Sequence, residues 1–425
     1  MFVKQFQLIK EIIMRKAGLI VFLILITISS QLVAQNNFIE KILLDNKNLF
    51  NDILTKIDSF EVQIIYTIID RDKNNFPSFT TYKYRVNPKD YFYPASSVKL
   101  PVSVLALEKL NNLNIAGLDK NTPLKIDSAR APQSAVVSDS SSESYLPSIA
   151  NYIKKIFLVS DNDAFNRLYE FVGQKGINDG LHRKDFKDVR IVHRLAGGFS
   201  TEDNRYTNPF LFYKNDKIMY KQPAQYNDES YTFELNKLIK GVGYLDSKDK
   251  LVNQPFDFSA KNYISLETLT EILKTIIFPE TCPEKMRFNL TEDDYKFLYK
   301  YMSMFPCESK HPAYDSTHYD SYVKYFMFGD SHKPITDNVR IFNKVGMAYG
   351  YLTDVSYIAD FDKKVEFMLS AVIHVNKDQI YNDGIYEYDQ IGLPFLANLG
   401  RVIYNYELNH IKKYLPDLSK IKFIY

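Results

Sequence analysis

The chain has 425 residues, which is long enough for a large core and, by length alone, for two or three domains. Its 53 Lys and Arg residues nearly balance 51 Asp and Glu residues, and the formal charge is +2. No basic stripe stands out from this mixed charge, so the sequence predicts no nucleic-acid partner. Trp is absent, but 32 Tyr and 30 Phe residues supply aromatic mass for a core and for pocket walls.

The first 34 residues have the pattern of an export signal. Basic residues precede an apolar run over residues 17–28, and the small residue Ala34 follows Ser29 and Ser30. We expect a cleaved signal peptide over residues 1–34 and a periplasmic or secreted mature protein. The alternative is an uncleaved anchor, since the weakly polar stretch 17–34 is barely long enough to span a bilayer. Such an anchor would be the expected route of membrane contact.

The next segments predict a helix followed by a hairpin. Apolar residues recur at helical spacing over residues 37–60, and residues 61–70 are β-branched and apolar, as in a buried strand. A turn at residues 72–75 leads to a predicted partner strand over residues 80–86. A buried helix follows, which opens near Ser96 and runs toward Leu113.

Ser96 and Lys99 lie three residues apart at the start of this helix, and positions i and i+3 share a helix face. A lysine whose pKa is lowered by burial can take the proton of a serine, and the helix start supplies free N–H groups for an oxyanion. Pro101 indicates either a short or 3₁₀ first turn or a helix that begins near Pro101 itself. The spacing alone is weak, because it recurs in three further pairs, and at least three of the four must be ordinary surface pairs. The three further pairs are Ser247/Lys250, Ser321/Lys324 and Ser419/Lys422.

The middle of the chain, from residue 119 to residue 337, is predicted to be helical with polar loops. Helical periodicity is present over residues 149–172, 264–277 and 292–304, and residues 138–144 form a solvated loop. Residues 213–262 mix charged residues, Gly and aromatics, and we treat them as an insertion. Cys282 and Cys307 predict a disulfide in an oxidising compartment, with two buried free cysteines as the alternative.

The end of the chain returns to strands, which are expected over residues 339–344, 352–360 and 365–375, before a last helix from about Tyr388 to Tyr414. Early and late strands around a helical middle predict an α+β fold. One antiparallel sheet is built from residues 36–118 and 338–425, is flanked by helices, and has an all-helical part inserted over residues 119–337. We expect one domain over residues 35–425.

Two further short motifs accompany Ser96 and Lys99. Ser160-Asp161-Asn162 follows an apolar run, and Lys344-Val345-Gly346 ends the first late strand. Three motifs in this order are a far stronger signal than one. Singly, Ser160 to Asn162 could be a helix N-cap and Lys344 an edge lysine before a turn. Together they resemble the serine β-lactamase and penicillin-binding protein family, and most closely the class A β-lactamases; the resemblance continues through Ala164 and Asn166.

The resemblance implies a role for each matched residue. Ser96 would be the acylated nucleophile, Lys99 its base, and Ser160 the donor of a proton to the leaving nitrogen. Asn162 would hold a substrate amide, and Lys344 beside Gly346 would supply positive charge for a substrate carboxylate. The backbone N–H groups of Ser96 and Met347 would form the oxyanion hole. Two lysines in one cleft would lower each other's pKa, as one base and one anchor require.

The chain departs from this family pattern at two places. Val345 stands where the family has Thr or Ser, which removes a hydrogen bond worth about 1 kcal/mol to a substrate carboxylate. The family also positions a water with a Glu and an Asn four residues later, whereas here Glu202 and Asn204 are only two residues apart. We predict Glu202 as the deacylating residue, with an ordinary surface loop as the alternative.

The sequence contains no GxSxG elbow, no HExxH and no P-loop, and its seven histidines have no ligand spacing, so we expect no metal and no cofactor. The first functional hypothesis is an exported hydrolase of the class A β-lactamase type, which would make it an antibiotic-resistance enzyme. It would open a small-molecule β-lactam through an acyl-Ser96 intermediate. The alternatives are a D,D-peptidase or related acyl transferase acting on peptidoglycan peptides, and a sensor that is acylated once and held.

Overall fold

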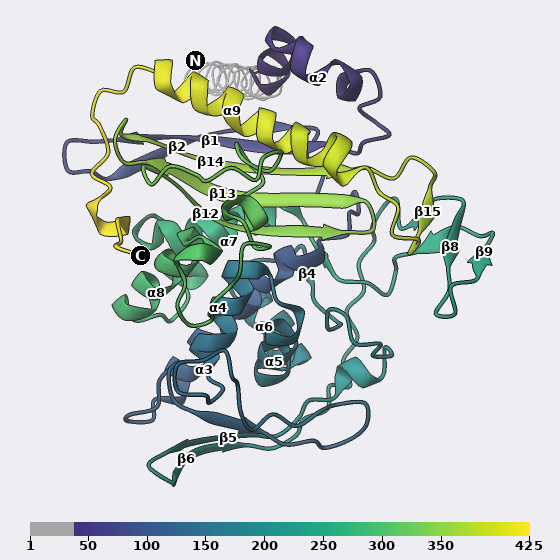
Figure 1. The fold of residues 1–425 in the computed structure, drawn as a ribbon, viewed down its shortest axis with the longest axis vertical. Helices are drawn as coiled ribbons and strands as arrows, with labels where there is room; N and C mark the ends of the chain where they lie inside the picture. Colours follow the sequence, from purple (N-terminus) through teal and green to yellow (C-terminus); the bar gives the residue numbers. More distant parts are fainter. Residues whose placement is uncertain (1–37) are drawn as a thin grey trace, which may run out of the picture.

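A five-stranded antiparallel sheet lies at the centre of the protein, in strand order β12-β13-β14-β1-β2 (Figure 1). The structure is a computed structural model and describes residues 38–425. The predicted signal segment, residues 1–34, therefore lies outside the described residues. The strands of the sheet are β1 (Gln63–Arg71), β2 (Pro77–Tyr84), β12 (Val339–Ala348), β13 (Tyr351–Asp360) and β14 (Val365–His374).

Both faces of the sheet are covered, which explains why β13 and β14 are buried along their whole length. In β1, Ile64, Tyr66 and Ile68 enter one core cluster, while Ile65 and Ile69 enter the other. Residues 38–45, α2 (Lys47–Leu54) and α9 (Leu393–Asn409) cover the first face (Figure 1). The remaining helices lie on the second face, and they are α3 (Lys99–Leu113), α4 (Ile149–Val159), α5 (Asn162–Val172), α6 (Gln174–Arg183), α7 (Leu266–Ile277) and α8 (Glu292–Ser303).

This architecture confirms the α+β prediction, because strands from both ends of the chain form one sheet around an inserted, mainly helical part. The inserted part also holds short strands that the periodicity did not predict. β3 (Leu124–Ile126), β5 (Phe210–Lys214) and β6 (Lys217–Gln222) form a three-stranded sheet. Two pairs are β4 (Val189–Arg190) with β11 (Tyr263–Ile264) and β7 (Ile239–Lys240) with β10 (Phe256–Asp257). In a last small sheet, β8 (Gly243–Leu245) lies between β9 (Leu251–Val252) and β15 (Ile380–Tyr381), which follows the inserted part. Apart from β5 and β6, these strands have only two or three residues, which is too short to show a period of two.

Two predicted helices have different bounds in the structure. The run over residues 149–172 is divided at Ser160, which adopts a left-handed conformation with φ 59° and ends α4 before α5 begins. The last helix is α9, which ends at Asn409, and a π-helical turn, η7 (Tyr388–Gly392), precedes it. None of the helices within residues 38–425 has the length and apolar character needed to cross a membrane.

The two cysteines do not form the expected disulfide. Both are free, with Cys282 buried and Cys307 exposed, so the alternative of two buried free cysteines is correct only for Cys282. The Cys307 thiol donates a hydrogen bond to Asp320 Oδ1 (3.1 Å). Although the residue is exposed, its thiol group is partly shielded from water, and this shielding and the Asp320 carboxylate raise the pKa of Cys307 to about 11. The thiol is therefore protonated at neutral pH.

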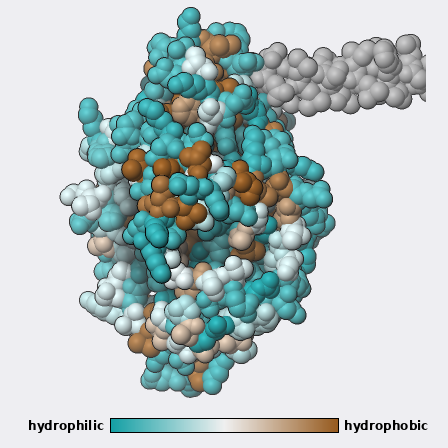
Figure 2. Space-filling view, turned by 90° about the vertical axis from the view of Figure 1, so that its right-hand side faces the viewer, coloured by the Kyte–Doolittle hydropathy of each residue, from teal (hydrophilic) through white to brown (hydrophobic). Residues whose placement is uncertain are grey.

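The surface is mostly hydrophilic, but apolar side chains gather near the middle of one face (Figure 2). That view shows the side of the molecule on which β8, β9 and β15 lie in Figure 1. Exposed apolar residues in and beside these strands include Val242, Leu251 and Ile385.

Candidate active site

Ser96 lies in a 3₁₀ turn, η1 (Ala95–Val98), that leads directly into α3 at Lys99. The first turn is thus locally 3₁₀, one of the two forms that Pro101 predicted, and the proline occupies a first-turn position where its missing N–H does no harm. Ala95 has φ 47°, a left-handed conformation that turns the chain sharply before the serine. Ser96 is half-buried and Lys99 is fully buried.

Ser160 and Asn162 lie at the junction of α4 and α5, against Lys99. The Asp161 carboxylate accepts from Ala164 N (2.7 Å) and caps α5, so the expected N-cap is Asp161 and its two neighbours are free for other contacts. Lys99 Nζ donates to the Ser160 carbonyl, to Ser160 Oγ (3.3 Å) and to Asn162 Oδ1 (2.7 Å). Among the described residues, Ser96 Oγ has no hydrogen-bond partner, so Ser96 and Lys99 share a site without bonding directly.

Lys344 on β12 approaches the same serine from the opposite side. Its Nζ donates to Ser160 Oγ (2.8 Å) and to the Val345 carbonyl (2.9 Å). Ser160 Oγ therefore accepts from both Lys344 and Lys99, which uses both lone pairs of the hydroxyl and leaves its proton free for donation.

Burial lowers the pKa of both lysines. The pKa of Lys99 falls to about 7 because its ammonium group loses hydration, and nearby Asp161 opposes this shift. The pKa of Lys344 falls well below its usual value, because burial and the charges of Lys99 and Lys324 act together, against the attraction of Asp354. The expected mutual effect is therefore present on one side only, because Lys99 lowers the pKa of Lys344 while burial alone lowers that of Lys99. Lys99 can be a neutral base near pH 7.

Gly346 allows β12 to lie against the Ser96 turn. A Cβ atom at this position would be 2.4 Å from the Pro94 carbonyl oxygen and 3.2 Å from Ser97 N. Any side chain here would separate the strand that carries Lys344 from the turn that carries Ser96.

The site opens into a cleft of about 350 Å³, which Ser96, Ser160, Asn162 and Met347 line together. Other lining residues come from the end of α4, the 319–329 segment, β12, η7 and the start of α9. They are Val159, Tyr319, Ser321, Tyr322, Val323, Tyr325, Gly329, Val345, Asp389 and Leu393. Asp389 is the one carboxylate in this lining set.

Comparison with known proteins relates part of this chain to a known family. Residues 50–224 match the family model Beta-lactamase2, described as the beta-lactamase enzyme family. Over these residues the chain is similar to the β-lactamase/penicillin-binding-like serine hydrolases. A solved β-lactamase from Sphaerobacter thermophilus DSM 20745 is similar at 10% identity and a TM-score of 0.45, covering 85% of this chain and 95% of that chain. No curated protein matches the chain.

The matched segment contains Ser96, Lys99, Ser160 and Asn162, whereas Lys344 lies more than a hundred residues beyond its end. The structure brings Lys344 back to the other four residues through β12. The third motif thus belongs to the same site as the first two.

Glu202 does not line the cleft. Its side chain is 55% exposed, and its nearest charged partner is Arg205, at 3.9 Å. The segment that precedes Glu202 is fixed by Asn166, which donates to the Leu195 carbonyl and accepts from Leu195 N, each at 2.9 Å. Arg194 anchors this segment through Glu170 (3.1 Å). This placement agrees with the alternative of an ordinary surface loop for Glu202.

Sequence reasoning missed a buried polar network behind Lys344. Lys324 Nζ donates to Asn343 Oδ1 (2.7 Å), Asn343 Nδ2 donates to Asp354 Oδ1 (2.8 Å), and Ser356 Oγ donates to the same oxygen (2.7 Å). The Ser321/Lys324 pair is therefore not a surface pair, since Ser321 is 2% exposed and Lys324 is 0% exposed. The available signal was a charged residue, Asp354, inside an otherwise apolar strand, because such a residue needs buried partners.

Proposed function

We propose that the protein opens the cyclic amide of a β-lactam through an acyl-Ser96 intermediate, as a class A β-lactamase-like enzyme outside the cytoplasm. The observation that carries the proposal is the position of Ser160, whose hydroxyl lies between Lys99 and Lys344 and lines one cleft with Ser96. This arrangement supplies a nucleophile, a base with a pKa of about 7 and a proton donor.

We expect acylation to proceed through the following bond and proton transfers. Ser96 Oγ attacks the carbonyl carbon, and its proton passes to neutral Lys99. The C–N bond of the ring breaks while Ser160 gives its proton to the leaving nitrogen, and Lys99 returns a proton to Ser160. The backbone N–H groups of Ser96 and Met347 are the expected donors to the oxyanion.

Substrate binding uses the remaining residues. The Lys99 bond occupies Asn162 Oδ1, which leaves Asn162 Nδ2 to donate to a substrate amide carbonyl. A substrate carboxylate beside Lys344 would raise the pKa of that lysine and restore its charge. Val345 is buried and adds no hydroxyl, so this carboxylate is held by about 1 kcal/mol less than in relatives with Thr or Ser.

One observation favours a second candidate function. With Glu202 exposed and Leu195 held by Asn166, the 191–206 segment brings no carboxylate to the cleft lining. Without a base to activate water, an acyl-enzyme persists. A D,D-peptidase or penicillin-binding acyl transferase, which passes its acyl group to an amine or releases it slowly, has this property.

The test is a mass-spectrometric time course of the mature protein with a chromogenic cephalosporin. The proposal expects a mass increase on Ser96 that Ser96→Ala abolishes. Ser247→Ala is the matched control, because Ser247 also precedes a lysine by three residues but is exposed. Rapid return to the free mass supports the β-lactamase function, and a persistent adduct supports the second candidate. An adduct that survives in Ser96→Ala contradicts both.

A further inference from the structure

A second pocket lies apart from the Ser96 cleft, because the two share no lining residue. It has a volume of about 710 Å³, within the range of small-molecule sites. The walls of this pocket are the second half of α3, the segment from the end of α5 through α6, and two neighbouring loop segments at residues 205–207 and 225–227.

Glycines help to keep this pocket open. Gly173, Gly176 and Gly180 all belong to its lining, so the α6 wall presents backbone where side chains would otherwise fill the space. A Cβ atom at Gly176 would meet one neighbour, Val172 Cγ1, at 3.4 Å, which is ordinary contact. Packing therefore does not require glycine at position 176.

The charged groups of the pocket leave an excess of positive charge. Both acidic residues are already paired, since Glu108 bonds to Lys184 (2.7 Å) and Asp179 to Lys175 (3.0 Å). Within residues 38–425, the Arg183 guanidinium has no ion-pair or hydrogen-bond partner. A ligand with negative charge would supply one.

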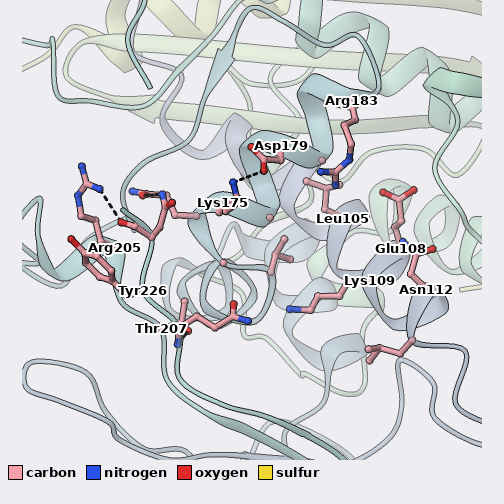
Figure 3. Close-up of a pocket in the computed structure, with 18 residues that line it drawn as sticks. Leu105, Glu108, Lys109, Asn112, Lys175, Asp179, Arg183, Arg205, Thr207 and Tyr226 are labelled. Atoms are coloured by element: carbon pink, nitrogen blue, oxygen red, sulfur yellow. Dashed lines mark hydrogen bonds and ion pairs between the residues drawn. The ribbon is translucent and has the colours of Figure 1, made fainter. Parts of the chain in front are cut away.

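Lys109 is the most enclosed of the cationic groups. Its Nζ donates to the Phe171 carbonyl (2.5 Å) and lies 4.7 Å from the centre of the Phe171 ring. Figure 3 shows this amine extending from α3 toward the middle of the pocket, with Arg183 above it and Thr207 across from it. An ammonium group has three N–H donors, so two remain for a ligand. Burial lowers the pKa of Lys109 to about 8, which an anion would reverse.

We propose that this pocket is a second binding site, for a small organic anion with an apolar body. Lys109 and Arg183 bind the anionic group. Leu105, Leu113 and Val172 contact the apolar part. The site is independent of the chemistry at Ser96.

The test uses two fluorescent probes that differ by one anionic group. 8-Anilino-1-naphthalenesulfonate carries a sulfonate, and N-phenyl-1-naphthylamine has the same aromatic body without it. Titration of the folded protein should show saturable binding of the sulfonate probe, and binding of the neutral probe should be at least about tenfold weaker, since a charge-assisted hydrogen bond is lost.

Two variants locate the binding site. Lys109→Met keeps the length and apolar stem but removes the charge, and should weaken the sulfonate probe about tenfold or more. Gly176→Phe fills the pocket without changing charge, and should abolish binding of both probes. The matched control is Lys154→Met, because Lys154 is also a partly buried lysine over an aromatic ring, 5.2 Å from the centre of Tyr301, but lies on α4 outside the pocket.

Thermal unfolding shows whether each variant is folded, and acylation of Ser96 is measured in the same samples. Unchanged affinity in both Lys109→Met and Gly176→Phe would overturn the proposal, as would equal affinity for the two probes or no saturable binding. Because acylation is read separately, these outcomes do not depend on the function proposed for Ser96.

Discussion

Gly346→Ala tests whether the close contact between β12 and the Ser96 turn holds the site together. The added methyl carbon would lie 2.4 Å from the Pro94 carbonyl oxygen, a backbone atom that no side-chain rotation can move away. Ordinary contact begins near 3.4 Å. The strand and the turn must therefore separate by about 1 Å, and Lys344 moves with the strand.

A displacement of this size at a reacting centre costs about 100-fold in rate, and overpacking of this kind costs about 1–3 kcal/mol in stability. We expect the second-order rate of Ser96 acylation by a chromogenic cephalosporin to fall by about that factor in Gly346→Ala. Gly117→Ala is the control, because Gly117 has φ 80° and the new methyl would meet only Met219, at 3.7 Å. It should lose about 1 kcal/mol through backbone strain and keep its acylation rate. A Gly346→Ala protein with unchanged acylation and unfolding temperature would refute the reasoning.

Three further substitutions and one pH–rate profile test the charges of the site. Lys99→Met should abolish acylation. It should also raise the free energy of unfolding at pH 7 by on the order of 3 kcal/mol, because it removes a buried amine with a lowered pKa. A fall in stability on denaturant titration would contradict this. Wild-type acylation should increase as pH rises through about 7, where Lys99 becomes neutral, and a flat pH–rate profile would exclude Lys99 as the base. Glu202→Gln should leave the lifetime of the acyl adduct within twofold, whereas a tenfold longer lifetime would make Glu202 the deacylating residue. Asp354→Asn should cost about 3 kcal/mol of stability in urea unfolding and slow acylation, since Asn343 and β12 lose a buried partner; wild-type values for both would show that the network does not position Lys344.

The sheet and the three motifs were predictable because each rests on a local pattern. Strands such as β13 are rich in apolar, β-branched and aromatic residues, and motif residues such as Ser160 are recognisable from their immediate neighbours. The joining of early and late strands in one sheet followed from their separation by a helical middle.

The parts that could not be predicted depend on contacts between distant segments. The division between α4 and α5 requires a left-handed serine, a conformation that local propensity disfavours and that the contacts with Lys99 and Lys344 hold in place. The burial of Lys324 depends on Asn343 and Asp354, which lie on two later strands. A lysine three residues after a serine gives no sign of those partners.

The three buried lysines also support the anionic substrate that we propose. Lys99, Lys324 and Lys344 lie within one buried region, and Asp354 is the buried carboxylate beside them, so ionising all three would leave positive charge uncompensated. Burial lowers all three pKa values and keeps part of this charge off the empty site. A bound carboxylate would supply the missing negative charge and draw a proton onto Lys344, whose pKa burial, Lys99 and Lys324 lower. Substrate binding would then charge the anchor while Lys99 stays neutral, which is the division of roles that acylation needs.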